Sequence, residues 1–240
     1  MPRPPSLPRA LLFDVFGTLV DWRRSVARQV AAAFECSGRT VDALAFADAW
    51  RGEYDPSMEP VRSGRRPYVS LDELHRENLQ TVLGRLDLTD VLDSDEQAGL
   101  NRSWERLDPW PDSVSGLDRL RYRFVVAPCS NGSVALMVKL ARHTGFAWDC
   151  ILGAEIAGTY KPEPDVYLAS CAALQLDPEQ VMMIAAHNAD LEAASSLGMM
   201  TGFFPRPTEH GHGQETDLIA SGDWTIVASD LMDLARCLLD

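Results

Sequence analysis

The stretch RALLFDVFGTLVDW, residues 9–22, decides how the rest of the chain is organised. The apolar run Ala10–Phe13 is typical of a buried strand, and it stops at a single acid, Asp14. Gly17 and Thr18 follow, after which a stretch with helical spacing begins. The acid is either the cap of that helix or a functional group, and the ends of the other strands decide between the two.

Composition narrows the class of protein. The chain has 240 residues, of which 46% are hydrophobic and 24% charged, so it is long enough for one large domain or a domain with an insertion. The net charge of −13 argues against nonspecific nucleic-acid binding, which needs Lys and Arg to neutralise phosphates. A small anionic substrate is still compatible with this charge, because a pocket can be locally positive on an acidic protein.

Cysteine usage and the N-terminus favour a cytoplasmic protein that is not attached to a membrane. The five cysteines have no short paired spacing, as expected of free thiols in a reducing compartment. The Pro-rich start MPRPPSLPRA lacks the apolar core of a signal peptide. No apolar run approaches the ~20 residues that a membrane helix needs.

The order of the expected elements indicates an α/β fold with a doubly wound, Rossmann-like parallel sheet. Residues 22–107 have helical patterns throughout, whereas residues 112–240 alternate short apolar strands with helices. The first strand therefore belongs with the later strands, and the block between them is too long for a loop. We expect a core formed by residues 1–21 and 108–240, with residues 22–107 inserted as an all-helical cap domain.

Local signals refine these elements. SLDE, from Ser70, and SDEQ, from Ser94, match the capping-box pattern and predict two helix starts in the cap. The Pro-, Gly- and Arg-rich stretch 56–67 predicts a loop between cap helices. The strands expected after the cap are 123–129, 150–154, 181–186, 201–204 and 224–228.

Polar side chains follow each of the first four expected strands. After Asp14, they are Ser130 and Asn131 behind the second strand, Lys161 behind the third, and His187, Asn188 and Asp190 behind the fourth. Because the carboxyl ends of parallel strands meet at one edge of a sheet, we expect these groups to converge on one site. The chain has only two lysines, so an ammonium group at this edge in an arginine-rich protein suggests a function.

Four motifs contain these residues: FDVFGTLVD at 13–21, CSNGS at 129–133, YKPEPDVY at 160–167 and AAHNADLEAA at 185–194. Taken together and in this order, they resemble the four motifs of the haloacid dehalogenase superfamily of hydrolases. The resemblance covers nearly the whole chain, with the helical cap inserted after the first motif. It implies that Asp14 is a nucleophile.

The residue two positions after Asp14 decides which branch of that family the chain resembles. Phosphatases of the family have a second Asp there, which protonates the leaving group and later activates water, whereas this chain has Phe16. An aromatic ring exchanges no proton, and Asp190 is the one carboxylate beside Asn188 in the fourth motif, so a Mg²⁺ site is not expected. The pattern is similar to the type II 2-haloacid dehalogenases, whose leaving group, a halide, needs no proton.

The resemblance to this branch implies a covalent mechanism without a metal or other cofactor. Asp14 attacks the carbon that bears the halogen, and water then attacks the carboxyl carbon of the resulting ester, which releases a 2-hydroxy acid. Lys161 would keep Asp14 ionised by the proximity of opposite charge. Asp190 would orient or activate the water, with Asn188 and Lys161 positioning it.

The same resemblance implies a substrate site made by the core and the cap. The groups expected to hold the substrate carboxylate are Ser130, Thr18 and the backbone N–H groups of Val15 and Phe16. The groups expected to cradle the departing halide are Arg51, within DAWRGEY of the cap, and Asn131. Tyr167, six residues after Lys161, is expected to orient its neighbours.

Two features of the C-terminal half differ from the family pattern or lie outside it. The fourth motif is one residue shorter than in the family members that it resembles, and we hypothesise that His187 narrows the halide end and so favours small halogens. The stretch 205–218 contains His210 and His212 without an acid or thiol cluster at ligand spacing. We therefore expect a loop near the rim of the site there.

The sequence leaves alternative functions and the assembly state to be considered. A Mg-dependent small-molecule phosphatase of the same superfamily would turn over p-nitrophenyl phosphate, and Phe16 is the feature against it. A phosphonate hydrolase would need a cap lysine, and residues 22–107 contain none. A non-catalytic binding protein is disfavoured by the combination of Asp14, Lys161 and Arg51. An apolar face on the cap would suit a homodimer.

Overall fold

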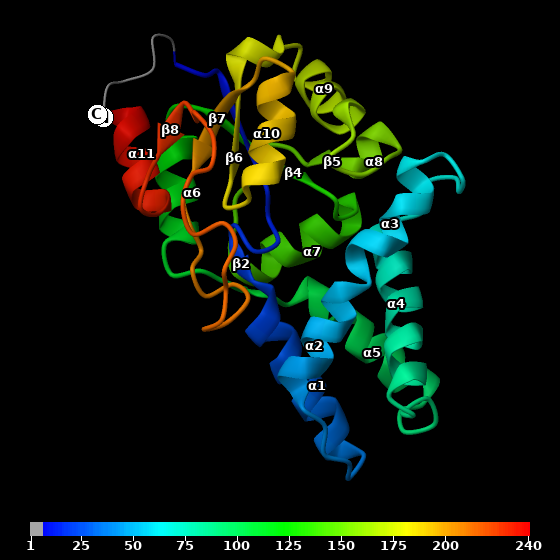
Figure 1. Ribbon diagram of the computed structural model, residues 1–240. Helices are drawn as coiled ribbons and strands as arrows, with labels where there is room; N and C mark the ends of the chain where they lie inside the picture. Colours follow the sequence, from blue (N-terminus) through cyan, green and yellow to red (C-terminus); the bar gives the residue numbers. More distant parts are fainter. Residues whose placement is uncertain (1–6) are drawn as a thin grey trace.

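The computed structural model describes residues 7–240, which form a parallel sheet with helices on both faces and a group of helices to one side (Figure 1). The six strands lie in the order β5–β4–β1–β6–β7–β8, and every neighbouring pair is parallel. They are β1 (Ala10–Phe13), β4 (Val125–Ser130), β5 (Leu152–Gly153), β6 (Val181–Ala185), β7 (Met200–Phe203) and β8 (Ile226–Val227). This arrangement confirms the doubly wound α/β fold. No helix in the described part of the chain has both the length and the apolar character of a membrane span.

Strand β1 marks the point where the order of the strands reverses. The chain adds β4 and β5 on one side of β1, and β6, β7 and β8 on the other. In open parallel sheets, the crevice beyond the carboxyl ends of the strands at such a point binds ligands. Asp14, the first residue after β1, therefore lies where this topology predicts a site.

The side chains of β1 alternate between two apolar layers. Leu11 and Phe13 belong to the layer that contains residues of α6, α7 and α11, whereas Ala10 and Leu12 belong to the layer of α9 and α10. These helices are α6 (Ser113–Arg121), α7 (Val134–Thr144), α9 (Pro164–Ala173), α10 (Asn188–Ser196) and α11 (Leu231–Leu239). Because both faces of the strand are buried, its sequence is continuously apolar.

The helices inserted after β1 lie outside the sheet (Figure 1). They are α1 (Trp22–Cys36), α2 (Ala43–Gly52), α3 (Tyr54–Arg62), α4 (Leu71–Arg85), α5 (Ser94–Asn101) and the 3₁₀ helix η1 (Arg102–Glu105). The chain leaves and re-enters the sheet part through a short antiparallel pair, β2 (Val20–Asp21) and β3 (Asp108–Pro109). The pair lies next to the boundaries expected at 21/22 and 107/108, and the division into two domains stays a prediction.

The loop predicted at 56–67 is wrong over its first half, because α3 extends through Arg62. Pro56 lies in the first turn of α3, where a helix needs no N–H donor, and Pro60 lies near its end. Met58 and Val61 are buried, and α3 packs on α4. This apolar contact outweighs the local effect of the prolines.

Both helix starts predicted in the cap occur, and one is displaced by a residue. Ser70 caps α4, which begins at Leu71, and its side chain accepts a hydrogen bond from the N–H of Glu73. Asp93, rather than Ser94, caps α5: its carboxylate accepts from the N–H of Glu96, whose carboxylate accepts from the N–H of Asp93. The same four-residue pattern begins one position earlier than expected, with a charged acceptor in place of a hydroxyl.

Candidate active site

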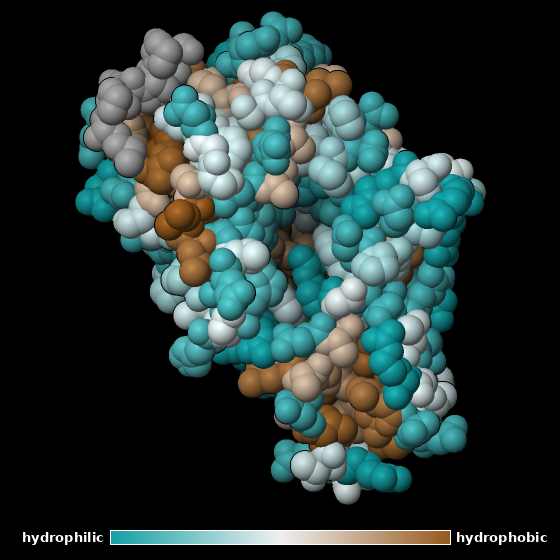
Figure 2. Space-filling model, viewed as in Figure 1, coloured by the Kyte–Doolittle hydropathy of each residue, from teal (hydrophilic) through white to brown (hydrophobic). Residues whose placement is uncertain are grey.

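A cavity of about 410 Å³ lies beyond the carboxyl ends of the central strands, between the sheet and the inserted helices α2 and α3. Figure 2 shows a hollow near the centre of the visible face. The cavity is lined by Asp14, Phe16, Arg51, Tyr54, Asp55, Met58, Arg62, Asn131, Lys161, Pro162, Tyr167, His187, Ala189 and Asp190. The expected convergence of the strand ends on one site therefore occurs.

The turn after β1 holds Asp14 in place. The N–H of Asp14 donates to the carbonyl of Ile184 at 3.0 Å, which extends the pairing with β6 by one residue. The hydroxyl of Thr18 donates to Oδ2 of Asp14 at 2.7 Å and accepts from the N–H of Ala186 at 3.0 Å. Thr18 thus couples the acid to the end of a second strand.

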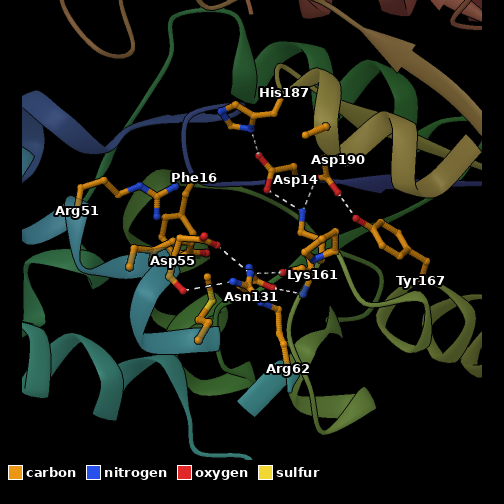
Figure 3. A pocket seen from close by; sticks show the side chains of 14 residues that line it. Asp14, Phe16, Arg51, Asp55, Arg62, Asn131, Lys161, Tyr167, His187 and Asp190 are labelled. Atoms are coloured by element: carbon orange, nitrogen blue, oxygen red, sulfur yellow. Dashed lines mark hydrogen bonds and ion pairs between the residues drawn. The ribbon is translucent and has the colours of Figure 1, made fainter. Parts of the chain in front are cut away.

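Lys161 lies between two carboxylates (Figure 3). Its Nζ donates to Oδ1 of Asp14 at 2.9 Å and also to Asp190, whose other oxygen accepts from the hydroxyl of Tyr167. The backbone N–H of Lys161 donates to Oδ1 of Asn131 at 2.8 Å, which positions the loop. Within residues 7–240, no cluster of three or more His, Cys, Asp or Glu side chains could hold a metal ion.

His187 approaches Asp14 from another side (Figure 3). Its Nδ1 lies 3.1 Å from Oδ2 of Asp14, and its Nε2 lies 2.9 Å from Oε2 of Glu209. Both ring nitrogens are therefore occupied by carboxylates and are not available to a halide, but the ring lines the cavity, and the hypothesis that it narrows the halide end stays a prediction. Glu209 belongs to the stretch 205–218, and the sequence analysis did not identify it.

The charges around Asp14 shift its titration strongly. Burial alone would raise the pKa of Asp14, but the charge of Lys161 and the hydrogen bond and charge of His187 outweigh burial and hold that pKa well below its ordinary value. Burial would likewise lower the pKa of Lys161, but Asp14 and Asp190 raise it well above the ordinary range. Asp14 is therefore an anion and Lys161 a cation at neutral pH.

His187 is also a cation in this surrounding. Burial would lower the pKa of His187, but Glu209 and Asp14 raise it well above its usual value. The pKa of Glu209 is lowered, because the charge and hydrogen bond of His187 outweigh burial. As an imidazolium, His187 donates an N–H hydrogen bond to each of the two carboxylates, from Nδ1 to Asp14 and from Nε2 to Glu209.

Arg51, on α2, brings positive charge from the cap side of the cavity. Its guanidinium carbon lies 3.7 Å from the ring centre of Tyr54 and 5.5 Å from that of Trp22. Its Nη1 is buried and has no hydrogen-bond partner in the described part of the chain. Buried donors in proteins are nearly always satisfied, so this one indicates a place for an anion.

Helix α3 contributes side chains that the sequence analysis did not identify, two of them within the segment 56–67 that was expected to be a loop. They are Tyr54, Asp55, Met58 and Arg62. Arg62 donates to Asp55 at 2.8 Å and to the backbone carbonyl of Lys161 at 3.3 Å. The second contact joins the cap directly to the loop that carries Lys161.

Some predicted site residues do not line the cavity. The hydroxyl of Ser130 is buried and accepts from the N–H of Gly132 at 3.1 Å, and Thr18 lies behind Asp14. The side chain of Val15 is buried, but the backbone N–H groups of Val15 and Phe16 donate to no acceptor within residues 7–240.

The prediction that Asn188 lies in the site needs correction. Its Nδ2 donates to Asp217 at 2.8 Å and to the carbonyl of Ile219 at 3.0 Å, and its Oδ1 accepts from Ser221 and Trp224. Asn188 begins α10, and its side chain is used to fix residues 217–224. The preceding residue, His187, is the one that reaches the cavity.

The chain matches proteins of known family along most of its length. A model of haloacid dehalogenase-like hydrolases matches residues 8–198. The (S)-2-haloacid dehalogenase of Pseudomonas sp. strain YL is 28% identical over 203 residues, which are 82% of this chain and 83% of that protein. A crystal structure of the defluorinating L-2-haloacid dehalogenase Rha0230 is 46% identical, covers 99% of each chain and has a TM-score of 0.96.

A second crystal structure, that of the L-2-haloacid dehalogenase PA0810, is 47% identical and has a TM-score of 0.93. The match covers 96% of this chain and 98% of that one. With Asp14, Lys161 and Asp190 brought together at the carboxyl edge of the sheet, these similarities give one conclusion. The chain belongs to the haloacid dehalogenase-like hydrolase family.

Proposed function

We propose that this protein hydrolyses the carbon–halogen bond of short (S)-2-haloacids to 2-hydroxy acids through an ester on Asp14. The observation that carries the proposal is an ionised Asp14 facing the cavity beside Phe16, where a phosphatase of the family would have a second acid. A halide leaves as a stable anion and needs no such acid. The names of the relatives, (S)- and L-2-haloacid dehalogenases, support the substrate class and its configuration.

In the first step, the carboxylate of Asp14 forms a bond to C2 of the substrate, and the halide departs with the electron pair of the broken bond. The low pKa of Asp14 supports this role, because the nucleophile is ionised over the working range of pH. Nη1 of Arg51, which has no partner among the described residues, is placed to donate a hydrogen bond to the departing halide. The free N–H groups of Val15 and Phe16 suit the substrate carboxylate.

In the second step, water attacks Cγ of Asp14 and transfers a proton to Asp190, which is already hydrogen-bonded to Lys161 and Tyr167. The bond between Cγ and the ester oxygen breaks, and Lys161 protonates the departing alkoxide. Asp190 then returns the first proton to Lys161. The second proton of the water is released, so one haloacid and one water give one hydroxy acid, one halide and one proton.

The remaining expectations about the protein complete this proposal. Residues 22–107 would close over the substrate as a cap, and Arg62 supports this by its contact with the Lys161 loop. The five cysteines, all of them free, support a cytoplasmic location. A homodimer stays a prediction, and light scattering of the purified protein tests it.

Isotope labelling tests the ester route. One turnover in H₂¹⁸O should place ¹⁸O in the tryptic peptide Ala10–Arg23, which contains Asp14, and not in the hydroxy acid. In Asp14→Asn, halide release should fall by roughly four to six orders of magnitude, as for other nucleophile replacements. Label that appears in the product of a single turnover, with none in the peptide, would show direct attack by water.

Halide release across substrates tests the substrate class. We expect chloride from (S)-2-chloropropionate and not from the (R) form, and bromide from bromoacetate. Fluoride release from fluoroacetate is expected from the similarity to the defluorinating relative. Turnover of p-nitrophenyl phosphate with Mg²⁺, and of no haloacid, would instead support the phosphatase alternative.

A further inference from the structure

Asp14 has two cationic neighbours, and each neighbour has a second acid. Lys161 is shared between Asp14 and Asp190. His187 is shared between Asp14, at 3.1 Å, and Glu209, at 2.9 Å. The mechanism above uses Lys161 and Asp190, but it gives no part to the pair formed by His187 and Glu209.

The two oxygens of Asp14 differ in their surroundings. Oδ2 accepts from the hydroxyl of Thr18 at 2.7 Å and from Nδ1 of His187, whereas Oδ1 accepts from Lys161. An oxygen that faces two fixed donors is a weaker nucleophile than its neighbour and a better place for negative charge. The geometry therefore favours Oδ1 as the oxygen that bonds to the substrate and Oδ2 as the carbonyl oxygen of the ester.

We propose that His187, held by Glu209, is a catalytic residue of the second step: with Thr18, it stabilises the negative charge that forms on Oδ2 of Asp14 when water attacks the ester. The proposal rests on the proposed function and identifies the groups that carry the charge of its tetrahedral intermediate. His187 touches a reacting atom, whereas Glu209 acts through His187 and is a positioning residue.

Glu209 explains how the imidazole can stay charged at the moment when it is needed. Forming the ester removes the negative charge of Asp14, and a buried cation whose sole partner had been Asp14 would then be uncompensated. Glu209 keeps one anionic partner on Nε2 of His187 throughout the cycle. Asp190 is the corresponding second acid of Lys161 until it takes a proton from the attacking water.

The position of Glu209 is built into the fold. Its side chain is 2% exposed, and its Oε1 accepts from Nε1 of Trp22 at 2.9 Å. Gly17, with φ +87°, lets the carboxylate approach, because a Cβ on Gly17 would lie 2.1 Å from Oε1. A left-handed backbone and an absent side chain at residue 17 thus make room for an acid from the distant stretch 205–218.

The step balances without a further reactant. Water adds its oxygen to Cγ of Asp14, the C=O electron pair moves to Oδ2, and one water proton goes to Asp190. The hydrogen bonds from His187 and Thr18 strengthen as this charge grows. The electron pair on Oδ2 then re-forms the C=O bond as the bond from Cγ to Oδ1 breaks. His187 only donates a hydrogen bond in this step, so it keeps its proton throughout.

Separating the two chemical steps tests His187. In a rapid-quench experiment with (S)-2-chloropropionate, His187→Gln should release a burst of about one chloride per enzyme, followed by slow turnover. Intact-protein mass spectrometry should find the ester accumulated on Asp14. Loss of one oxyanion donor typically slows such a step by roughly 10²–10³-fold, and we expect that factor in ester hydrolysis.

The pH dependence tests Glu209 with a readout that a purely structural role would not change. In the wild type, the rate of ester hydrolysis should fall at alkaline pH as His187 loses its proton, because Glu209 keeps its charge when the ester removes that of Asp14 and so still raises the pKa of His187. Glu209→Gln should move that fall to lower pH. His210, 3.6 Å from Glu209, faces the acid rather than the ring of His187. Glu215→Gln, an exposed acid of the same stretch, is the matched control and should leave the profile unchanged.

The outcomes separate this proposal from the proposed function. If His187→Gln slows the chloride burst and the later turnover equally, with no ester accumulated, His187 does not act in the second step, although dehalogenation by the wild type stands. If Glu209→Gln does not fold, the wild-type profile decides, since a hydrolysis rate that stays flat through the alkaline range overturns the proposal. If the wild type releases no halide from any haloacid, the proposed function itself fails.

Discussion

The two sides of the cavity differ in how their charges are compensated. On the sheet side, Asp14 and Lys161 are buried and His187 is partly buried, and each contacts at least two charged or polar partners. On the cap side, Arg51 rests on aromatic rings, and its buried Nη1 has no partner within the described residues. The charged side chains of the sheet side are paired with one another without a ligand, whereas the guanidinium of Arg51 on the cap side keeps a buried donor that has no partner among the described residues.

This difference matches two separate functions, bond making at Asp14 and binding of the halide. Bond making at Asp14 needs charges that are fixed in advance, because dipoles that do not have to reorganise stabilise a transition state best. Binding a halide needs a cation whose hydrogen-bonding capacity is unused until the anion arrives. We therefore expect substitutions on the sheet side to cost both stability and activity, and substitution of Arg51 to cost activity alone.

The largest effect is expected from Lys161→Met. This change leaves Asp14 and Asp190 buried without their shared cation, and breaking a buried ion pair typically costs about 3–5 kcal/mol of unfolding free energy. Halide release should fall to background, because the pKa of Asp14 rises and the leaving alkoxide loses its proton donor. Urea unfolding and a halide electrode measure the two effects.

The other lysine of the chain supplies the control. Lys139 is half exposed and pairs with Glu105 on the surface, so Lys139→Met should change stability by less than about 1 kcal/mol and leave turnover unaltered. Equal stability of Lys161→Met and Lys139→Met would contradict the view that the sheet side is held together by its charges.

A smaller effect, on activity alone, is expected from Arg51→Met. Loss of a donor to the departing halide should slow the first step by roughly 10²–10³-fold. The unfolding free energy should stay the same or rise, because the substitution removes a cation for which residues 7–240 supply no acid partner. Rapid-quench measurement of the chloride burst checks the rate, and urea unfolding checks the stability.

Arg65→Met, in the exposed segment after α3, is the control for this prediction. It should change neither the burst nor the stability. If Arg51→Met instead unfolds the cap while the burst of the remaining folded protein is normal, then Arg51 is a structural residue and the contrast between the two sides disappears.

The sheet side could be predicted from the sequence because parallel topology fixes where strand ends meet. Asp14, Asn131, Lys161 and Asp190 all line the cavity as expected. The exception is the fourth strand end, where β6 passes into α10 within two residues. Adjacent side chains there point in different directions, and the sequence offers no way to tell whether His187 or Asn188 faces the cavity.

The cap side and Glu209 were harder to predict for different physical reasons. Prolines in α3 suggested a loop over 56–67, so Met58 and Arg62 were missed, although Met58 and Val61 follow helical spacing. Glu209 comes from an irregular stretch whose path is set by tertiary contacts, such as the hydrogen bond from Trp22. A local sequence pattern does not reveal such contacts. The sequence predicted a loop at 205–218 near the rim of the site, but not that Glu209 within it reaches His187.

The smallest effect on catalysis is expected from Asn188→Ala, which separates the two neighbours at the end of β6. The side chain of Asn188 makes four hydrogen bonds to residues 217–224 and none to the cavity-lining side chains. Its loss should cost about 1–2 kcal/mol of unfolding free energy, because the N–H of Ser221 and the indole of Trp224 lose their acceptor. The rate of halide release by the folded variant should stay within about twofold of the wild type, since interactions outside the site contribute little to transition-state binding. A hundredfold loss of activity with unchanged stability would instead support the water-positioning role that the family resemblance implies for Asn188. Asn188 would then be a residue of the site, together with His187.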